Sequence, residues 1–166
     1  MEIRKTVPED IPAVRQLEAD PENRRWVYQW SEAQHRAALE DRDTGHWMLT
    51  DARGQTVGYC ILKGLENPFG TVELMRIVIG PKGRGYGRAA LQAIMARVFA
   101  ELKARRLWLD VVSTNERAIR LYESLGFVHE GTLRESALID GEPASMRLYG
   151  LLAREWRAEA GNRTHQ

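Results

Sequence analysis

Between residues 71 and 102 the spacing of the apolar residues changes once, from that of a strand to that of a helix. This change marks the central unit of the chain. Residues 72–79 form a short apolar run that stops at Gly80-Pro81, which is typical of a strand buried on both faces. After a glycine-rich turn, apolar side chains recur at helical spacing: Leu91, Ile94, Met95, Val98, Phe99 and Leu102. This spacing predicts a long helix that buries one stripe. The chain therefore contains a strand, a tight turn and a helix in that order.

The residues before this unit predict a strand and two helical stretches. Residues 3–7 favour a strand, and Pro8-Glu9-Asp10 then opens a helix. The apolar stripe of that helix consists of Ile11, Val14 and Leu17. A second helical stretch follows and continues through Leu39, with Ser31 and Gln34 spaced as a capping box.

Two further strands precede the central one. Residues 45–50 and 56–62 flank a four-residue turn that ends in glycine, which predicts a hairpin. The loop 64–70 then leads into the central strand. We expect this loop, with Glu66, to lie at the mouth of a substrate site, although turn chemistry alone also explains its composition.

The residues after the long helix predict a strand, a helix and a final hairpin. Residues 107–112 form an apolar strand, which is parallel to the central one if the connection is a right-handed crossover. A helix follows three candidate caps, Ser113, Thr114 and Asn115, with Ser113 and Glu116 spaced as a capping box.

The same helix has a natural end at Gly126, and a strand is expected from Phe127 onward. Asp140-Gly141 marks a hairpin between residues 131–139 and 144–152. We expect one domain over residues 1–152 and a polar tail over 153–166.

Composition limits the classes of function. With 166 residues, 43% of them hydrophobic, the chain can bury a substantial core as one globular domain. A net charge of +1 suggests neither nucleic acid nor a membrane surface as partner. The single cysteine, Cys60, excludes an internal disulfide and a cysteine-rich metal site, and we expect no metal. The N-terminus lacks the apolar region of a leader and no stretch has the length of a membrane span, so we expect a cytoplasmic protein.

The glycine-rich turn is a candidate anion site. It comprises Lys82, Gly83, Arg84, Gly85, Tyr86, Gly87 and Arg88. The first N–H groups of a helix are unpaired and carry the positive end of its dipole, and glycines allow a phosphate to approach them closely. A plain strand-to-helix turn is the simpler alternative, but three basic residues favour an anion. The spacing matches neither the nucleotide P-loop nor the dinucleotide fingerprint.

A second block of residues makes the pattern specific. Downstream of the basic glycine turn stand Asn115, Ala118, Leu121, Tyr122, Gly126 and Phe127. Over residues 3–152 the chain resembles the GNAT superfamily of acyl-CoA-dependent N-acetyltransferases, and is similar to its branch of ribosomal-protein N-terminal, polyamine and drug acetyltransferases. The resemblance implies an α/β (α+β) fold, namely a mixed, mostly antiparallel twisted sheet of about seven strands with a splayed parallel central pair and about four flanking helices.

The resemblance also implies a reaction. The enzyme would move the acetyl group of acetyl-CoA, the co-substrate, to the primary amine of a small molecule or peptide. Tyr122 stands at the family position usually assigned to the acid that protonates the departing thiolate; as a residue alone it could be a packing tyrosine. Glu73 is our candidate base, because it is the only carboxylate in the central strand, and alternation places it on the side of Met75, Ile77 and Ile79. It could instead pair with Arg76, and Asp110 is a weaker candidate base.

The remaining site residues follow from the same resemblance. The backbone of Ile77, Val78 and Ile79 would meet the oxyanion and the coenzyme, the turn would hold the pyrophosphate, and Asn115 would orient the pantetheine arm or simply cap its helix. Trp26 and Trp30 would shape the acceptor site, with helix packing as the default reading of these aromatics. In the usual family loop the first position is glutamine or arginine; here it is Lys82, and residues 81–85 are about two residues shorter than in common members.

Three classes of function are compatible with these features. The first is the N-acetyltransferase described above. The second is a non-catalytic acyl-CoA binding or sensing module, against which the presence of both Tyr122 and Glu73 argues. The third is a nucleotide-binding regulatory domain, which the missing nucleotide motifs disfavour. The late hairpin could supply an edge for a homodimer.

Overall fold

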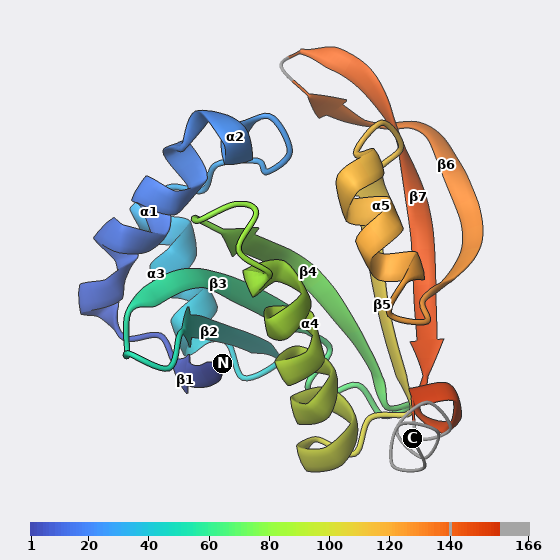
Figure 1. Cartoon of the computed structure of the whole chain (residues 1–166), viewed down its shortest axis with the longest axis horizontal. Helices are drawn as coiled ribbons and strands as arrows, with labels where there is room; N and C mark the ends of the chain where they lie inside the picture. The colour runs from blue at the N-terminus through green and yellow to red at the C-terminus, as the bar shows by residue number, and fades with distance from the viewer. Residues whose placement is uncertain (140, 157–166) are drawn as a thin grey trace.

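The fold is a single seven-stranded sheet covered by helices on both faces (Figure 1). In this computed structural model, residues 1–139 and 141–156 are described. The strands are β1 (Glu2–Lys5), β2 (Thr44–Thr50), β3 (Thr56–Lys63), β4 (Thr71–Ile79), β5 (Arg106–Val112), β6 (Val128–Ile139) and β7 (Glu142–Leu152). The helices are η1 (Pro8–Asp10), α1 (Ile11–Ala19), α2 (Pro21–Arg24), α3 (Glu32–Glu40), α4 (Tyr86–Ala96), the π-helical turn η2 (Arg97–Glu101) and α5 (Glu116–Glu123).

The strand order β1-β2-β3-β4-β5-β7-β6 is antiparallel except at its centre, where β4 and β5 are parallel. The mixed sheet with a parallel central pair that the sequence predicts is therefore confirmed. β4 and β5 pair only over the couples Thr71–Arg106, Val72–Leu107 and Glu73–Trp108. Beyond Glu73 the two strands diverge, and Figure 1 shows the opening between them widening toward the end of β4.

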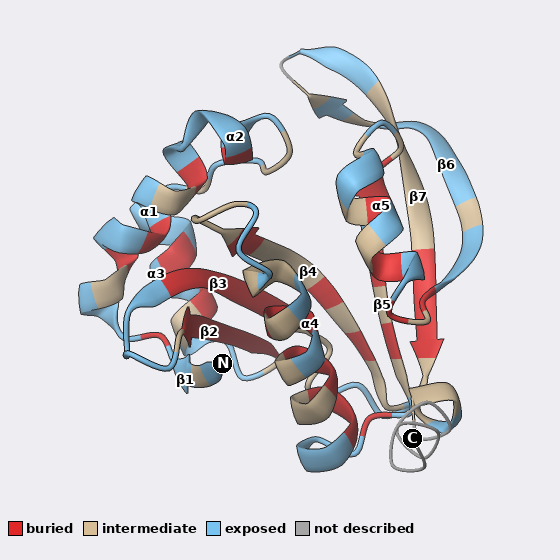
Figure 2. Cartoon of the chain, viewed as in Figure 1, coloured by how far each residue is buried: buried red, intermediate tan, exposed pale blue. Residues whose placement is uncertain are grey.

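The sheet separates two apolar layers. Helix α4 buries Ala90, Leu91, Ile94 and Met95 against one face, and this larger cluster includes Leu62, Leu74 and Leu107. On the other face, Val14 of α1 packs with Met48, Tyr59, Ile61 and Val78 of the strands. Strands β2 and β3 are covered on both faces and are buried almost throughout, whereas the outer part of the β6–β7 hairpin is exposed (Figure 2).

A bulge in β4 changes the face of the sheet toward which the side chains after it point. Leu62 pairs with Leu74 but the preceding Ile61 pairs with Arg76, so Met75 is an extra residue on the β4 side. Leu74 and Ile77 consequently both pack in the α4 layer. Glu73 alternates with Leu74 and faces the opposite layer. Our expectation that Glu73 shares a side with Ile77 and Ile79 was therefore wrong, because simple alternation does not survive a bulge.

Most predicted boundaries lie within a few residues of the observed ones. β1 ends at Lys5 instead of residue 7, and the capping box of Ser31 and Gln34 is confirmed at the start of α3. At α5 the cap is Asn115, whose Oδ1 accepts the N–H of Ala118 at 3.3 Å, and not the predicted Ser113 box.

The end of the chain packs onto the domain as far as the structure describes it. Residues 153–156 form a helical turn, and the Trp156 ring lies 5.5 Å from that of Phe99. Asp140 of the predicted hairpin turn and tail residues 157–166 lie outside the described residues. Within the described ranges, no helix combines the length and apolarity that crossing a membrane requires.

Candidate active site

The glycine turn leads directly into α4, as its sequence predicts. Gly83 and Gly85 have φ of +73° and +76°, a region that L-residues with a Cβ seldom adopt, and Gly85 caps the helix. A Cβ added at either glycine would meet no atom within 4 Å, so their backbone borders open space. The first N–H groups of α4 have no acceptors within the helix. The turn thus offers backbone donors, at the positive end of a helix dipole, to an anion.

The basic side chains of the turn differ in what they contact. The Lys82 ammonium donates to Asn23 Oδ1 of α2 and to the Ile79 carbonyl, which fastens the turn to α2. Burial lowers the pKa of Lys82, and the nearby charge of Arg117 acts in the same direction. Arg88 donates to the Ser124 hydroxyl at 2.6 Å, whereas Arg84 is exposed. Lys82 therefore holds the turn in place while Arg84 faces solvent.

In the second half of β4, the edge that faces β5 has no neighbouring strand paired with it. Ile77, Val78 and Ile79 pair with β3 on one side, but β5 has already diverged on the other. Backbone N–H and C=O groups that point toward β5 from this stretch have no strand partner in the described sheet. This edge is thus geometrically open to a ligand, except that the Ile79 carbonyl already accepts the Lys82 ammonium.

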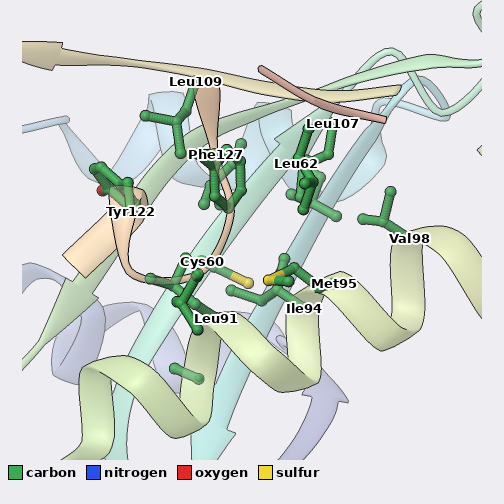
Figure 3. Close-up of a cluster of buried hydrophobic side chains, with 14 of the residues drawn as sticks. Cys60, Leu62, Leu91, Ile94, Met95, Val98, Leu107, Leu109, Tyr122 and Phe127 are labelled. Carbon is green, nitrogen blue, oxygen red and sulfur yellow. The ribbon is translucent and has the colours of Figure 1, made fainter. Parts of the chain in front are cut away.

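Tyr122 lies on α5 beside this opening. Its ring packs at 5.8 Å from that of Phe127, and only 7% of the residue is exposed. Figure 3 shows its oxygen pointing away from the apolar cluster. Burial raises the pKa of Tyr122 to about 12, with a further contribution from the negative charge of Asp110. The phenol is therefore protonated at neutral pH and available to donate.

Glu73 is the last β4 residue paired with β5, so it stands where the two strands begin to diverge. Burial raises its pKa, Asp110 raises it further, and Lys63 of the neighbouring strand opposes this. Asp110 is an exposed residue, but partial desolvation of its carboxyl raises its own pKa. No ion pair to Glu73 occurs among the described residues, because Arg76 is bound to Glu18 instead. The negative charge of Asp110 thus raises the pKa of both Glu73 and Tyr122.

The three predicted acceptor residues are not brought together. Trp30 packs against the layer of α1 and α3, and the Arg76 guanidinium stacks over its ring at 4.5 Å. Trp26 is half-buried and carries Arg25 over its ring at 4.8 Å. Glu66 is exposed in the loop before β4, 3.5 Å from Arg42. Packing explains the position of Trp30, as the default reading of the aromatic segment expected.

Sequence reasoning missed a buried polar network on the face of the sheet that α1 and α3 cover. Glu18 of α1 is 1% exposed, and its Oε1 lies 2.6 Å from Arg76 Nη1 and accepts the Tyr59 hydroxyl. His35 Nε2 stands 3.3 Å from the same oxygen, though off the line of a good hydrogen bond. Burial alone would raise the pKa of Glu18, but His35, Tyr59 and Arg76 hold it below its usual value. The available signal was a carboxylate at i+4 from Val14, within the apolar stripe of the helix.

The network continues across the N-terminal strands. His35 Nδ1 is 3.2 Å from His46 Nε2, and His46 Nδ1 is 2.8 Å from the Thr6 hydroxyl. Burial lowers the pKa of His46 to about 4, so this histidine is neutral at pH 7. A chain of polar side chains thus runs from Arg76 of β4 to the end of β1.

Comparison with known proteins identifies the family to which this fold belongs. The acetyltransferase (GNAT) domain family matches residues 1–128. The chain belongs to this family, and the resemblance inferred from the glycine turn and the Asn115–Phe127 block is confirmed.

Individual relatives are distant. The chain is 29% identical over 105 residues to spermidine N(1)-acetyltransferase of Vibrio cholerae, covering 62% of this chain and 60% of that enzyme. It is 31% identical over 78 residues to the putative ribosomal N-acetyltransferase YdaF of Bacillus subtilis, a match that spans 47% of this chain and 43% of the relative. It is also 31% identical over 152 residues to the ribosomal protein bS18-alanine N-acetyltransferase of Escherichia coli K12, covering 82% of this chain and 93% of the relative.

Solved structures support the fold. The spermidine N-acetyltransferase of Vibrio cholerae in complex with CoA and spermine superposes with a TM-score of 0.85 at 21% identity, covering 94% of this chain and 97% of that one. A dodecameric structure of the same enzyme gives a TM-score of 0.80 at 23% identity, covering 93% of this chain and 95% of that one. At these identities the likeness concerns the fold alone.

Proposed function

We propose that the protein is an N-acetyltransferase that moves the acetyl group of acetyl-CoA to a primary amine by direct attack. The observation that carries the proposal is the opening between β4 and β5. It begins at the half-buried Glu73 carboxyl, is bordered by the Tyr122 hydroxyl, and adjoins the glycine turn at the start of α4. The reaction needs a base, an acid and a site for the coenzyme phosphates, and all three candidates border the free edge of β4.

The coenzyme would lie across the opening. Its pyrophosphate would accept the N–H groups of residues 83–88, with Arg84 and Arg88 adding charge and Lys82 holding the turn through Asn23. Its pantetheine arm would run along the free edge of β4 at Ile77–Ile79. Asn115 contributes by capping α5, which fixes the helix that carries Tyr122.

The chemistry divides between two side chains. An alkylammonium acceptor has a pKa of about 10, so a proton must leave it before its nitrogen can attack. Glu73, whose pKa is raised by burial, takes that proton directly or through one water. The N–C bond forms as the tetrahedral oxyanion develops against the β4 backbone. The oxyanion then collapses to the amide carbonyl as the C–S bond breaks, and Tyr122 donates a proton to the departing thiolate. The second proton leaves the acylated nitrogen and returns through water to the tyrosinate, which restores Tyr122.

The acceptor is a primary amine of a small molecule or a peptide. Relatives whose names specify spermidine or a ribosomal-protein alanine support this class without selecting between its members. Glu73 faces the layer built by α1, α3 and the segment around Trp30, so the acceptor would approach from that side. Trp26, Trp30 and Glu66 are the side chains that we propose for the rim of the acceptor site.

Thiol release tests the proposal. Wild type, Tyr122→Phe and Glu73→Gln are mixed with acetyl-CoA and a panel of polyamines, aminoglycosides, amino acids and peptides with free N-termini. We expect release with at least one acceptor class and a reduction of kcat by about 10²-fold or more in each variant, because each removes one proton-transfer group. Acetyl-CoA affinity, measured by calorimetry, should stay within about threefold of wild type, since the phosphate contacts are untouched.

The pH profile separates the two roles. A raised Glu73 pKa means that the rate of wild type rises with pH as this carboxyl ionises, and Glu73→Gln should lose that limb. Coenzyme binding without thiol release from any acceptor would favour the alternative of an acyl-CoA binding or sensing module. Failure to bind acetyl-CoA would refute both.

We propose in addition that copies associate through the β6–β7 hairpin. Its outer part extends beyond the body of the domain and exposes Leu133 and Leu138, with 48% and 68% of their surface accessible (Figure 2). Exposed apolar side chains on an extended arm are suited to a partner surface. Light scattering should report an oligomer, and Leu133→Lys together with Leu138→Lys should shift it to the monomer; an unchanged mass would refute this interface.

A further inference from the structure

Glu18 binds more separate elements of the fold than any other side chain described above. Oxygen Oε1 contacts Arg76 of β4, Tyr59 of β3 and His35 of α3, while Oε2 accepts the backbone N–H of Trp30 at 3.1 Å. The carboxylate itself belongs to α1. One buried charge therefore joins two helices, two strands and the segment between α2 and α3.

Such a group has a large energetic cost unless all its partners are present. A carboxylate removed from water is destabilising by several kcal/mol unless a cation and hydrogen-bond donors compensate it. Here the compensation comes from Arg76, whose side chain is 8% exposed, and from the Tyr59 hydroxyl. The same stability could be reached with well-packed apolar side chains, so stability alone does not explain an ion pair at this position.

The partners of Glu18 surround the acceptor side of the proposed site. Arg76 immediately follows the bulge residue of β4 and stands three positions from Glu73, on the same face of the sheet. Trp30 is held twice, through its backbone N–H by Glu18 and through its ring by the Arg76 guanidinium at 4.5 Å. Its ring also lies 5.3 Å from that of His35. Among the described residues, no hydrogen bond or ion pair joins Glu18 to the glycine turn.

We propose that Glu18 is a positioning residue for the amine acceptor. It fixes the segment of residues 25–31 and the bulged part of β4 in the arrangement that receives the amine opposite Glu73. This inference rests on the proposed N-acetyltransferase function and adds to it a buried residue that touches neither substrate. Loss of the Glu18 charge should loosen the acceptor wall and leave the coenzyme turn intact.

The first test compares Michaelis constants. Glu18→Gln keeps the shape of the side chain and removes its charge, and Glu32→Gln is the matched control, an exposed carboxylate on α3 paired only with Arg36 at 2.8 Å. We expect Glu18→Gln to raise the KM of the amine at least about tenfold, with the KM of acetyl-CoA within about twofold of wild type. Glu32→Gln should match wild type in both constants.

A second pair of variants guards against a purely structural effect. Tyr59→Phe removes one donor and retains the ion pair, so it should fold and shift the amine KM in the same direction by a smaller factor. Arg76→Gln combined with Glu18→Gln should be no worse than the stronger single variant if both residues act through one pair. An unchanged amine KM in a folded Glu18→Gln protein, or equal increases in both Michaelis constants, would overturn the proposal.

Hydrogen exchange distinguishes failure of this inference from failure of the proposed function. The Trp30 amide should exchange slowly in wild type and Glu32→Gln, and at least about tenfold faster in Glu18→Gln, whether or not an acceptor has been found. If wild type releases no thiol with any amine, the proposed function fails, and the positioning role for an amine fails with it. If thiol is released but Trp30 exchange is identical in all variants, only the role of Glu18 is refuted.

Discussion

The neutral, buried His46 makes a specific prediction about acid stability. Only 5% of its surface is exposed, and burial is the largest cause that lowers its pKa to about 4. Among the charged and titratable neighbours, His35 and Arg76 lower the pKa further, whereas Glu18 and Asp10 raise it. The net result is a histidine that resists protonation while the protein is folded.

The sign and size of the effect follow from proton uptake. In the unfolded chain His46 has its ordinary pKa of 6.5, so between that pH and about 4 the unfolded chain binds a proton that the folded chain excludes. Stability from this group is complete above pH 6.5 and is lost progressively as the pH falls toward 4. With these two values, lowering the pH from 7 to 5 reduces the free energy of unfolding by about 2 kcal/mol.

Urea denaturation at pH 7, 6 and 5 measures this loss as a shift of the midpoint at constant m-value. His46→Gln should remove most of the pH dependence of the free energy of unfolding, since glutamine does not titrate. His129→Gln, which changes an exposed histidine of β6, is the matched control and should retain it. The reasoning would be refuted if the free energy of unfolding of wild type changed by less than about 0.5 kcal/mol between pH 7 and 5. It would also be refuted if that energy depended as steeply on pH in His46→Gln as in wild type.

Two further predictions concern backbone contact and the coenzyme turn. Gly58→Ala should lower the free energy of unfolding by about 1–3 kcal/mol in urea melts, because a Cβ there would stand 2.2 Å from the Val78 carbonyl oxygen. Gly131→Ala should change the free energy of unfolding little, because a Cβ there meets nothing within 4 Å. Equal losses of stability in the two variants would contradict the contact argument. Lys82→Met should lower the melting temperature through loss of the Asn23 contact yet keep the acetyl-CoA Kd within about threefold by calorimetry; a Kd at least about tenfold weaker would show that the ammonium binds phosphate directly.

Local patterns predicted the centre of the fold because they depend on neighbouring residues. The apolar run before Gly80, the glycine turn and the stripe beginning at Leu91 each report one element, and all three elements occur where expected. Asn115 also behaves as a local signal, since its side chain caps the helix that it begins. The order of these elements, together with the residues of the Asn115–Phe127 block, was sufficient to infer the family.

The remaining features depend on contacts between distant elements. The bulge at Met75 appears only in the register of β4 against β3, so the orientation of Glu73 could not follow from alternation. The role of Glu18 requires α3, β3 and β4 to converge on one side chain, which no spacing within α1 reveals. Lys82 was assigned to an anion from its place in the turn, but its Asn23 partner lies in α2, far away in sequence.

The short ladder between β4 and β5 has a consequence for how the chain folds. Strands β1–β4 come from residues 2–79 and strands β5–β7 from residues 106–152, so each part of the sheet can assemble from one continuous segment. Three residue pairs form the ladder that joins the two parts of the sheet, and α4 connects them through the chain. Sequence-local assembly followed by one late joining step favours rapid folding. A coenzyme bound across the opening would bridge the two segments, and at one hundred times its Kd it would add about 2.7 kcal/mol to the free energy of unfolding. The concentration of the coenzyme would then help to determine the stability of the folded chain.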